Sequence, residues 1–122
     1  MTLFILMFLA HCIDDFFLQG GCLVNLKQKS WWDKQTQDAK YSKDYLMGLF
    51  IHAFEWSAML CLVLIMFGAS NLFLAGSFVI NGLIHMFVDN LKANKFKINL
   101  IQDQLIHLVQ ILVTVLLFYY VN

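Results

Sequence analysis

Three pairs of ionisable residues share one spacing, a histidine and an aspartate four positions apart. The pairs are His11 with Asp15, His85 with Asp89, and Asp103 with His107. Residues i and i+4 of a helix lie on one face, one turn apart, so each pair presents an imidazole and a carboxylate together. These groups are usual protein ligands of zinc, iron and manganese. The spacing favours a site for a divalent metal, which would also offset buried carboxylate charge that lysines do not reach easily.

The segments that carry these pairs are strongly apolar. Hydrophobic residues make up 61% of the 122 residues and charged residues 13%, against about 45–50% and about 25% in a soluble domain. This composition excludes an ordinary soluble domain and a disordered chain. A spanning helix needs about 20 mostly apolar residues. The sequence therefore predicts an all-α fold, a four-helix transmembrane bundle that forms a single domain over residues 1–122, with spans at 2–18, 45–67, 72–91 and 100–121.

The eight lysines fall in two predicted loops, residues 19–44 and 92–99. These loops lie on the same side of a four-helix chain, and the positive-inside rule makes that side cytoplasmic. Both termini then face outward from a bacterial cytoplasmic membrane. The chain has no arginine and zero net charge, so we expect membrane lipids and no nucleic acid as partners. Two alternatives are weaker: a cleaved signal peptide at residues 2–18, which lacks a basic start, and a globular all-helical protein.

The polar residues of the four segments also agree in depth. Counted from the cytoplasmic ends, the aspartates of the three pairs form one layer, and the histidines form a second layer one turn deeper. His52 falls in the histidine layer, and Glu55 lies about one turn below it. Lipid cannot satisfy such groups. We therefore expect these faces to point inward and to form one polar His/Asp cavity that opens to the cytoplasm.

The predicted site has three groups of residues. The metal ligands are His11, Asp15, His52, His85, Asp89, Asp103 and His107, around one or two ions with zinc as first choice. The residues that orient ligands or substrate are Gln19, Asn81 and Gln104, and the candidate catalytic bases are Glu55 and Asp14. Structural alternatives stay open. They are a polar network without metal, a purely hydrogen-bonding His52, contact of Asp14 with lipid headgroups, and a helix-packing role for Glu55.

The order of the motifs resembles a known family. Three runs are similar to signatures of a family of small bacterial and phage membrane proteins of unknown function: His11-x3-Asp15-Phe16-x2-Gln19, His85-x3-Asp89-x2-Lys92 and Asp103-Gln104-x2-His107. The resemblance covers nearly the whole chain and implies a four-helix membrane architecture with this site, but no activity. More loosely, and in residue types only, the motifs resemble membrane-bound metal-dependent hydrolases.

Several functions are compatible with this pattern. The first is a membrane-embedded metal-dependent hydrolase that acts on a lipid or another amphiphile at the cytoplasmic leaflet. The alternative is a non-enzymatic cation or proton channel, a transporter or a small phage-type membrane effector. Polar residues extend only about halfway, to Ser77 and Thr114, which favours a blind pocket over a pore. A third possibility is a structural module whose polar network fixes the bundle geometry. A homo-oligomer is compatible with all three.

Overall fold

A computed structural model describes residues 1–121, and these residues contain helices and no strand. The α-helices are α1 (Thr2–Ile13), α2 (Gly21–Leu26), α3 (Lys29–Gln35), α4 (Tyr45–Met66), α5 (Asn71–Ala93) and α6 (Leu100–Val121). A π-helical turn (Asp14–Leu18) continues α1, and a 3-10 turn (Ala39–Tyr41) precedes α4. The prediction of an all-α fold is confirmed.

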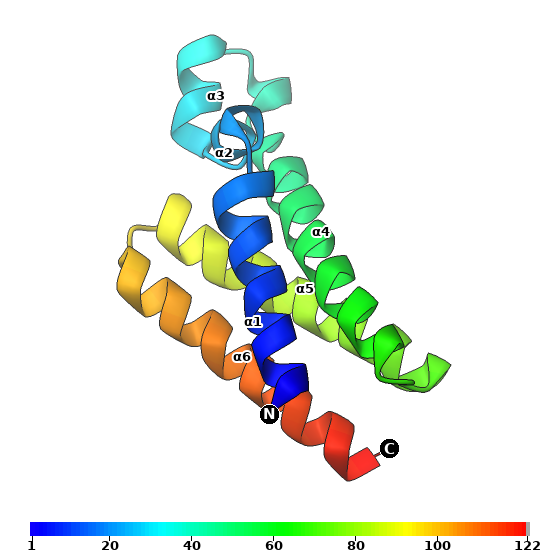
Figure 1. The fold of residues 1–122 in the computed structure, drawn as a ribbon. Coiled ribbons are helices and arrows are strands. Elements are labelled where there is room, and N and C mark those ends of the chain that lie inside the picture. The colour runs from blue at the N-terminus through cyan, green and yellow to red at the C-terminus, as the bar shows by residue number, and fades with distance from the viewer. Residues whose placement is uncertain (122) are drawn as a thin grey trace.

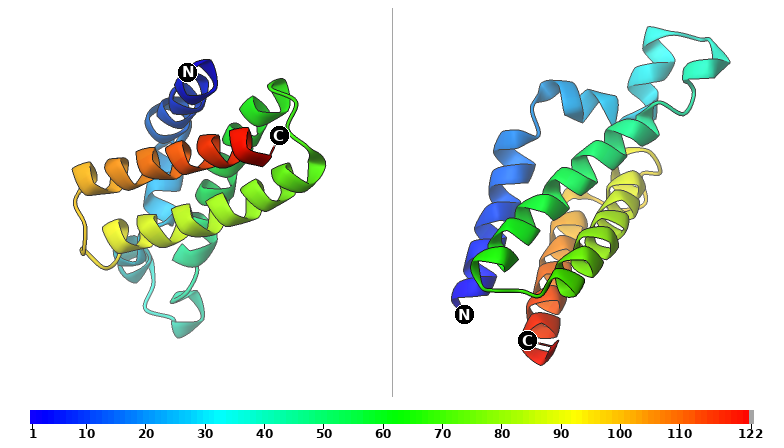
Figure 2. Two further views of the ribbon diagram at one scale, coloured as in Figure 1. Left: turned by 90° about the horizontal axis from the view of Figure 1, so that it is seen from below. Right: turned by 90° about the vertical axis from the view of Figure 1, so that its right-hand side faces the viewer.

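The four longer helices pack in a closed ring. α4 contacts α1 and α5, and α6 contacts α5 and α1. Figure 1 and Figure 2 show the two termini at one end of the bundle, with α2 and α3 at the other end. The chain passes from α1 to α4 through these two short helices, which therefore lie over one end of the ring.

Of the described helices, α4, α5 and α6 are long and apolar enough to cross a membrane. α1 is not among them, because its α-helical part ends at Ile13 and the π-helical turn extends it only to Leu18. The number of helices also differs from the prediction. The structure has six α-helices within residues 1–121, whereas the sequence predicted four. The additional helices, α2 and α3, lie in the predicted loop 19–44. Extended backbone at Gly20 separates α2 from the first helix.

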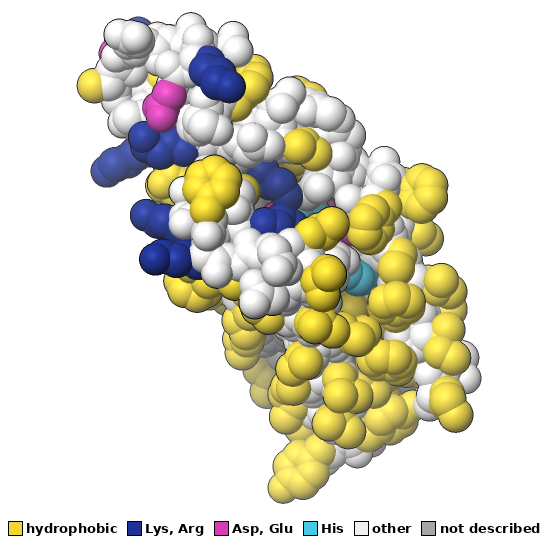
Figure 3. Space-filling model, turned by 90° about the vertical axis from the view of Figure 1, so that its left-hand side faces the viewer, with side chains coloured by type: hydrophobic (Ala, Val, Ile, Leu, Met, Phe, Trp, Pro, Cys, Tyr) yellow, Lys and Arg dark blue, Asp and Glu magenta, His cyan; other side chains and the backbone are white. Residues whose placement is uncertain are grey.

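Apolar and ionisable side chains are buried at opposite ends of the bundle. The end that holds both termini has an apolar core that includes Leu3, Leu60, Leu64, Ile111 and Phe118. The other end buries histidines, aspartates and a lysine. The exposed side chains of the long helices are mainly aliphatic and aromatic, and in Figure 3 the lysines gather at one end above a hydrophobic surface. A polar interior under an apolar exterior suits a bundle surrounded by lipid.

α2 approaches α4 closely at Gly48. A Cβ atom at this glycine would lie 2.5 to 2.7 Å from backbone atoms of Leu26 and Lys27, so only glycine fits without a shift of the backbone. Two side chains hold the same junction. Trp32 donates its indole N–H to the Leu26 carbonyl (2.9 Å), and Asn94, the residue directly after α5, donates to the Lys27 carbonyl (3.0 Å). The junction between α2 and α3 is thereby fixed against α4 and α5.

Candidate metal centre

Each of the four long helices contributes one histidine to a buried cluster. His11 comes from α1, His52 from α4, His85 from α5 and His107 from α6, and each is at most 2% exposed. The His85 ring stacks on the His107 ring, with centroids 4.0 Å apart, and on the Trp56 ring at 4.4 Å. The structure thus brings together the four histidines that the sequence placed in one layer.

Two sets of three residues lie close enough to hold a metal ion. They are Asp15, His52 and His85, and then His85, Asp89 and His107; the potential ligand atoms of each set lie within 4.8 Å of one another. In the second set, Asp89 Oδ1 is 3.5 Å from His107 Nε2 and 3.8 Å from His85 Nε2. In the first set, His52 Nε2 is 3.6 Å from Asp15 Oδ1 and 3.1 Å from His85 Nε2. Because His85 belongs to both, the sets form one continuous cluster.

Most of these separations suit a shared cation better than direct hydrogen bonds. Tetrahedral ligands at about 2.0–2.1 Å from zinc lie about 3.3–3.4 Å from one another, whereas an N–H···O hydrogen bond spans about 2.7–3.2 Å. The nearest Asp89 oxygens lie 3.4 to 3.8 Å from Nε2 of His52, His85 and His107. Asp103 Oδ1 is a further neighbour, 3.4 Å from His107 Nε2. The buried groups could therefore hold a metal ion after small side-chain shifts.

Several buried atoms of the cluster have no hydrogen-bond partner within residues 1–121. They are both carboxylate oxygens of Asp14, Oδ1 of Asp15 and Asp103, Nδ1 of His52 and His85, and both ring nitrogens of His107. A buried polar atom without a partner costs about 1–3 kcal/mol. Because so many unpartnered atoms lie together, the cluster is suited to a bound cation, which would coordinate several of them at once.

Two lysines reach the buried carboxylates, which corrects the expectation that they do not. Lys27 Nζ donates to Asp89 Oδ2 at 2.6 Å, and Lys92 Nζ donates to Asp103 Oδ2 at 2.5 Å. Lys27 belongs to the junction between α2 and α3 and is only 4% exposed. The close packing of that junction on Gly48 carries the lysine from the predicted loop into the bundle.

The lysines balance only part of the negative charge of the cluster. Its carboxylates are those of Asp14, Asp15, Asp89 and Asp103, and its ammonium groups are those of Lys27 and Lys92. If the histidines are neutral, the carboxylates outnumber the ammonium groups. Buried charge without compensation is costly. A divalent cation would offset much of this negative charge.

Asp14 is a buried member of the cluster and not a headgroup contact. Its side chain is fully buried, and its Oδ2 lies 3.6 Å from His52 Nδ1. The π-helical turn begins at this residue, and its wider winding alters the rotation between residues, so that Asp14 and Asp15 both face inward. A signal for this burial exists in the sequence, because a heptad-like spacing joins Leu3, Met7, Ala10 and Asp14 on one helical face.

Both ring nitrogens of His11 are engaged in hydrogen bonds. Nδ1 accepts from Trp56 Nε1 (2.8 Å), so Nε2 carries the proton of the neutral ring and donates to Gln104 Oε1 (3.0 Å). Gln104 Nε2 in turn donates to Asp15 Oδ2 (3.0 Å) and Asp103 Oδ2 (3.2 Å). In this arrangement His11 has no lone pair to offer a metal. It orients two carboxylates through Gln104.

The other predicted site residues differ in their relation to the cluster. Gln19 Nε2 lies 2.8 Å from His52 Nε2 and so belongs to it. Asn81 lies one turn below the histidine layer and accepts a hydrogen bond from Gln110 (2.9 Å). Glu55 is partly buried, and its carboxylate repels that of Asp14, although no hydrogen bond or ion pair within residues 1–121 joins it to the cluster.

The fold and the site together define an all-helical protein with a His/Asp cluster buried between four helices. The chain belongs to the family described as protein of unknown function DUF3307, whose model matches residues 3–122. This membership agrees with the resemblance to a family without an assigned activity. It gives no support to the looser resemblance to hydrolases. No curated protein and no solved structure matches the chain.

Proposed function

We propose that this protein is embedded in a membrane and binds a divalent cation, zinc by preference, at His85, Asp89 and His107. The strongest support is the convergence of these buried ligands, beside unpartnered polar atoms, inside a bundle with an apolar exterior. A cation with three protein ligands keeps one coordination position open, as catalytic zinc sites do. We therefore infer a metal-dependent hydrolase and not a purely structural metal site.

Neighbouring residues support this ligand set. Lys27 holds Asp89 by Oδ2 and leaves Oδ1 directed toward the two histidines. Asp103, held by Lys92, lies beside His107, with its Oδ1 3.4 Å from His107 Nε2. When bound, the cation supplies Lewis-acid chemistry. Asp14 and Glu55 are the candidate proton acceptors in this proposal.

The substrate inferred for this site is a lipid or another amphiphile. The lysine-rich end, which includes α2, α3 and the loop before α6, is proposed to face the cytoplasm, with both termini outside. The histidines lie about two to three turns inside the helices, below that end. Bulk soluble polymers do not reach this depth, whereas molecules dissolved in the cytoplasmic leaflet do.

A channel is the weaker alternative. Beyond the histidine layer buried polar side chains continue only about as far as Ser77 and Thr114, and the end with the termini is filled by apolar side chains, among them Leu3, Leu60 and Leu64, each 0% exposed. A proton or cation pathway needs polar groups or water along its whole length. The apolar core is therefore the reason to prefer a blind site that opens toward the lysines.

Elemental analysis of protein purified in detergent without chelator tests the metal site. We expect about one divalent ion per chain in the wild type, because three ligands surround one position. Asp89→Asn and His107→Ala each remove a ligand and should lower occupancy about tenfold or more. The matched control is Asp33→Asn, because this carboxylate pairs with Lys29 on the exposed surface of α3. Wild-type protein without stoichiometric metal would contradict the proposal and favour a structural polar network.

Lipid turnover tests the hydrolytic part separately. The metal-loaded wild type should release product from at least one lipid class, and His107→Ala should lose metal and turnover together. Glu55→Gln should keep the metal and lose only turnover, provided that Glu55 is the proton acceptor. If metal-loaded protein hydrolyses no lipid but carries ions across liposome membranes, the transporter alternative replaces the hydrolase.

A further inference from the structure

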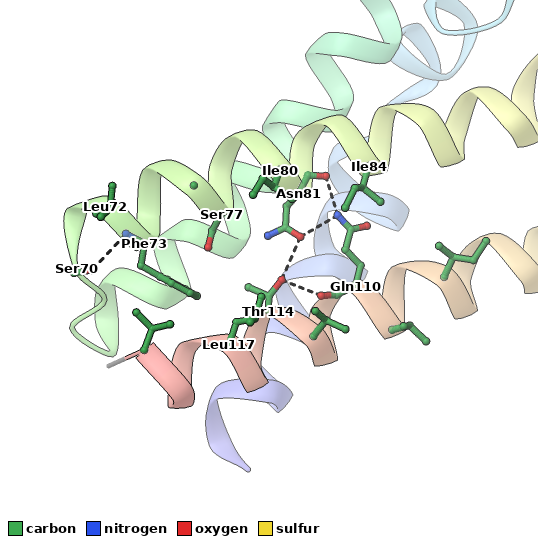
Figure 4. Close-up of a pocket in the computed structure, with 15 residues that line it drawn as sticks. Ser70, Leu72, Phe73, Ser77, Ile80, Asn81, Ile84, Gln110, Thr114 and Leu117 are labelled. Carbon is green, nitrogen blue, oxygen red and sulfur yellow. Dashed lines mark hydrogen bonds between the residues drawn. The ribbon is translucent and has the colours of Figure 1, made fainter.

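A groove runs between α5 and α6 along the half of the bundle away from the lysines. It has a volume of about 530 Å³ and is lined mainly by aliphatic side chains, including Leu72, Ile80, Val113 and Leu117 (Figure 4). This volume lies within the range of small-molecule sites, about 300–1,000 Å³. Gly76 also lines the groove, and a Cβ atom there would meet nothing within 4 Å. The groove is thus open space on a face that the proposed membrane would surround.

The floor of the groove carries a small polar network. Gln110 Nε2 donates to the carbonyl oxygen (2.8 Å) and to Oδ1 (2.9 Å) of Asn81, and the Thr114 hydroxyl donates to the Gln110 carbonyl oxygen (2.9 Å) and lies 3.2 Å from the same Oδ1. Figure 4 shows these side chains meeting between the two helices. Gln110 is 7% exposed, and its Oε1 is buried without a partner in residues 1–121. Asn81 Nδ2 donates to no described group either.

An unpartnered acceptor and an unused donor in an apolar groove indicate the kind of ligand that fits. Leaving Gln110 Oε1 buried and unpaired is unfavourable, and Asn81 Nδ2 has a donor to spare, so a ligand with one polar end and one apolar body gains from both parts of the groove. A carbonyl oxygen can accept from Asn81 Nδ2, and a carboxyl or hydroxyl hydrogen can be donated to Gln110 Oε1. Among molecules of the hydrocarbon phase, an acyl chain has this chemistry.

We propose that the groove between α5 and α6 binds one long acyl chain, with its carbonyl or carboxyl end at Asn81 and Gln110. The hydrocarbon then extends toward Leu72 on α5 and Leu117 on α6. The stretch of α5 from Asn81 to Leu72 is about 14 Å long, which accommodates most of an acyl chain. Aliphatic walls on both helices contact it throughout.

This inference rests on the proposed function only where it names the substrate. Asn81 lies one helical turn from His85 on α5, and the groove ends at Ile84 and Ile106, each of which directly precedes a histidine of the cluster. The polar end of the bound ligand is thus about 6 Å along the helix from the cluster. The substrate class is a long-chain acyl ester whose acyl carbon lies at the cluster, one turn from Asn81, during hydrolysis. Water adds its oxygen to that carbon, the acyl–oxygen bond breaks, the alcohol leaves with a proton, and the fatty acid formed is the ligand of the groove.

Photolabelling with a diazirine-bearing palmitic acid in liposomes tests the groove. We expect labelled peptides from α5 and α6, and loss of most of this label when excess unlabelled palmitic acid competes. Gly76→Phe places a ring in the open groove and should lower the competed labelling at least tenfold. The matched control is Val79→Phe, since this residue is exposed on the same helix and does not line the groove. The control should label as the wild type does.

Label that resists competition, or that spreads evenly over lipid-facing residues of all helices, would overturn the acyl-chain site. The competition arm uses wild-type protein, so it does not depend on the folding of Gly76→Phe. Metal content of the same samples separates the two proposals. Competed label on metal-free wild type would retain the groove and overturn the metal site, whereas bound metal with uncompeted label would do the reverse.

Discussion

The two ends of this bundle are built from the same helices but are held together by different interactions. At the end with the termini, Leu3, Leu60 and Ile111 pack in a core of dispersion contacts, which have no direction and tolerate small changes. At the other end, most buried side chains are ionisable, and each depends on one or two particular partners. Apolar packing at the end with the termini therefore stabilises the fold. The ionisable end carries buried groups that stability alone does not require.

Replacing Lys27 with methionine should produce the largest loss of stability. Methionine keeps the apolar stem but leaves Asp89 buried without its 2.6 Å partner. Removing one member of a buried ion pair costs about 3–5 kcal/mol. Reversible unfolding of the detergent-solubilised protein, followed by circular dichroism, measures this change. The double variant Lys27→Met/Asp89→Asn should recover most of the loss, because it removes the uncompensated charge.

Lys29→Met is the matched control for this experiment. Lys29 pairs with Asp33, and both side chains are about half exposed. Exposed pairs of this kind contribute about 0–1 kcal/mol, so the control should unfold nearly as the wild type does. Equal effects of the two lysine variants would mean that Lys27 is not a structural counter-ion of the cluster, and the contrast between the two ends would weaken.

A smaller loss is expected at the apolar end from Leu60→Ala. In water such a truncation costs about 2–5 kcal/mol through lost transfer energy and a cavity. Inside a membrane or micelle the transfer from water is largely absent, so we expect about 1–3 kcal/mol from lost packing. The same unfolding measurement records it, and elemental analysis should find metal occupancy unchanged. Loss of metal in this variant would show that the two ends are coupled and not separable.

Sequence patterns predicted the regular parts of this molecule well. α4 and α6 begin at the residues where the predicted spans begin, because long apolar runs between polar loops define a helix with little need for tertiary information. The layer of four histidines could also be predicted, since helical spacing and chain direction fix the depth of each residue. His11, His52, His85 and His107 meet as this reasoning requires.

The partners of the cluster could not be predicted in the same way. Lys27 reaches Asp89 only because α2 packs on α4, a contact between segments without a shared periodicity. The hydrogen bond from Trp56 that occupies His11 also joins two helices and leaves no trace in local spacing. Asp14 differs, because its heptad relation to Leu3 is visible in the sequence. The i, i+4 pairing of the histidines and aspartates directed attention to its neighbour instead.

The last predicted effect concerns the contact that delivers Lys27. In Gly48→Ala the new Cβ would lie 2.5 to 2.7 Å from backbone atoms of Leu26 and Lys27, so α2 must shift away from α4. Overpacking of this kind costs about 1–3 kcal/mol. We also expect faster amide hydrogen exchange over residues 21–35, because the displaced junction loses its support.

Gly76→Ala is the matched control, because its Cβ meets nothing within 4 Å. Alanine favours a helix over glycine by about 1 kcal/mol, so this variant should be as stable as the wild type or slightly more so. If Gly48→Ala behaves like Gly76→Ala, α2 is free to adjust without loss, and Lys27 is held at Asp89 by their ion pair alone and not by the packing of α2 on α4.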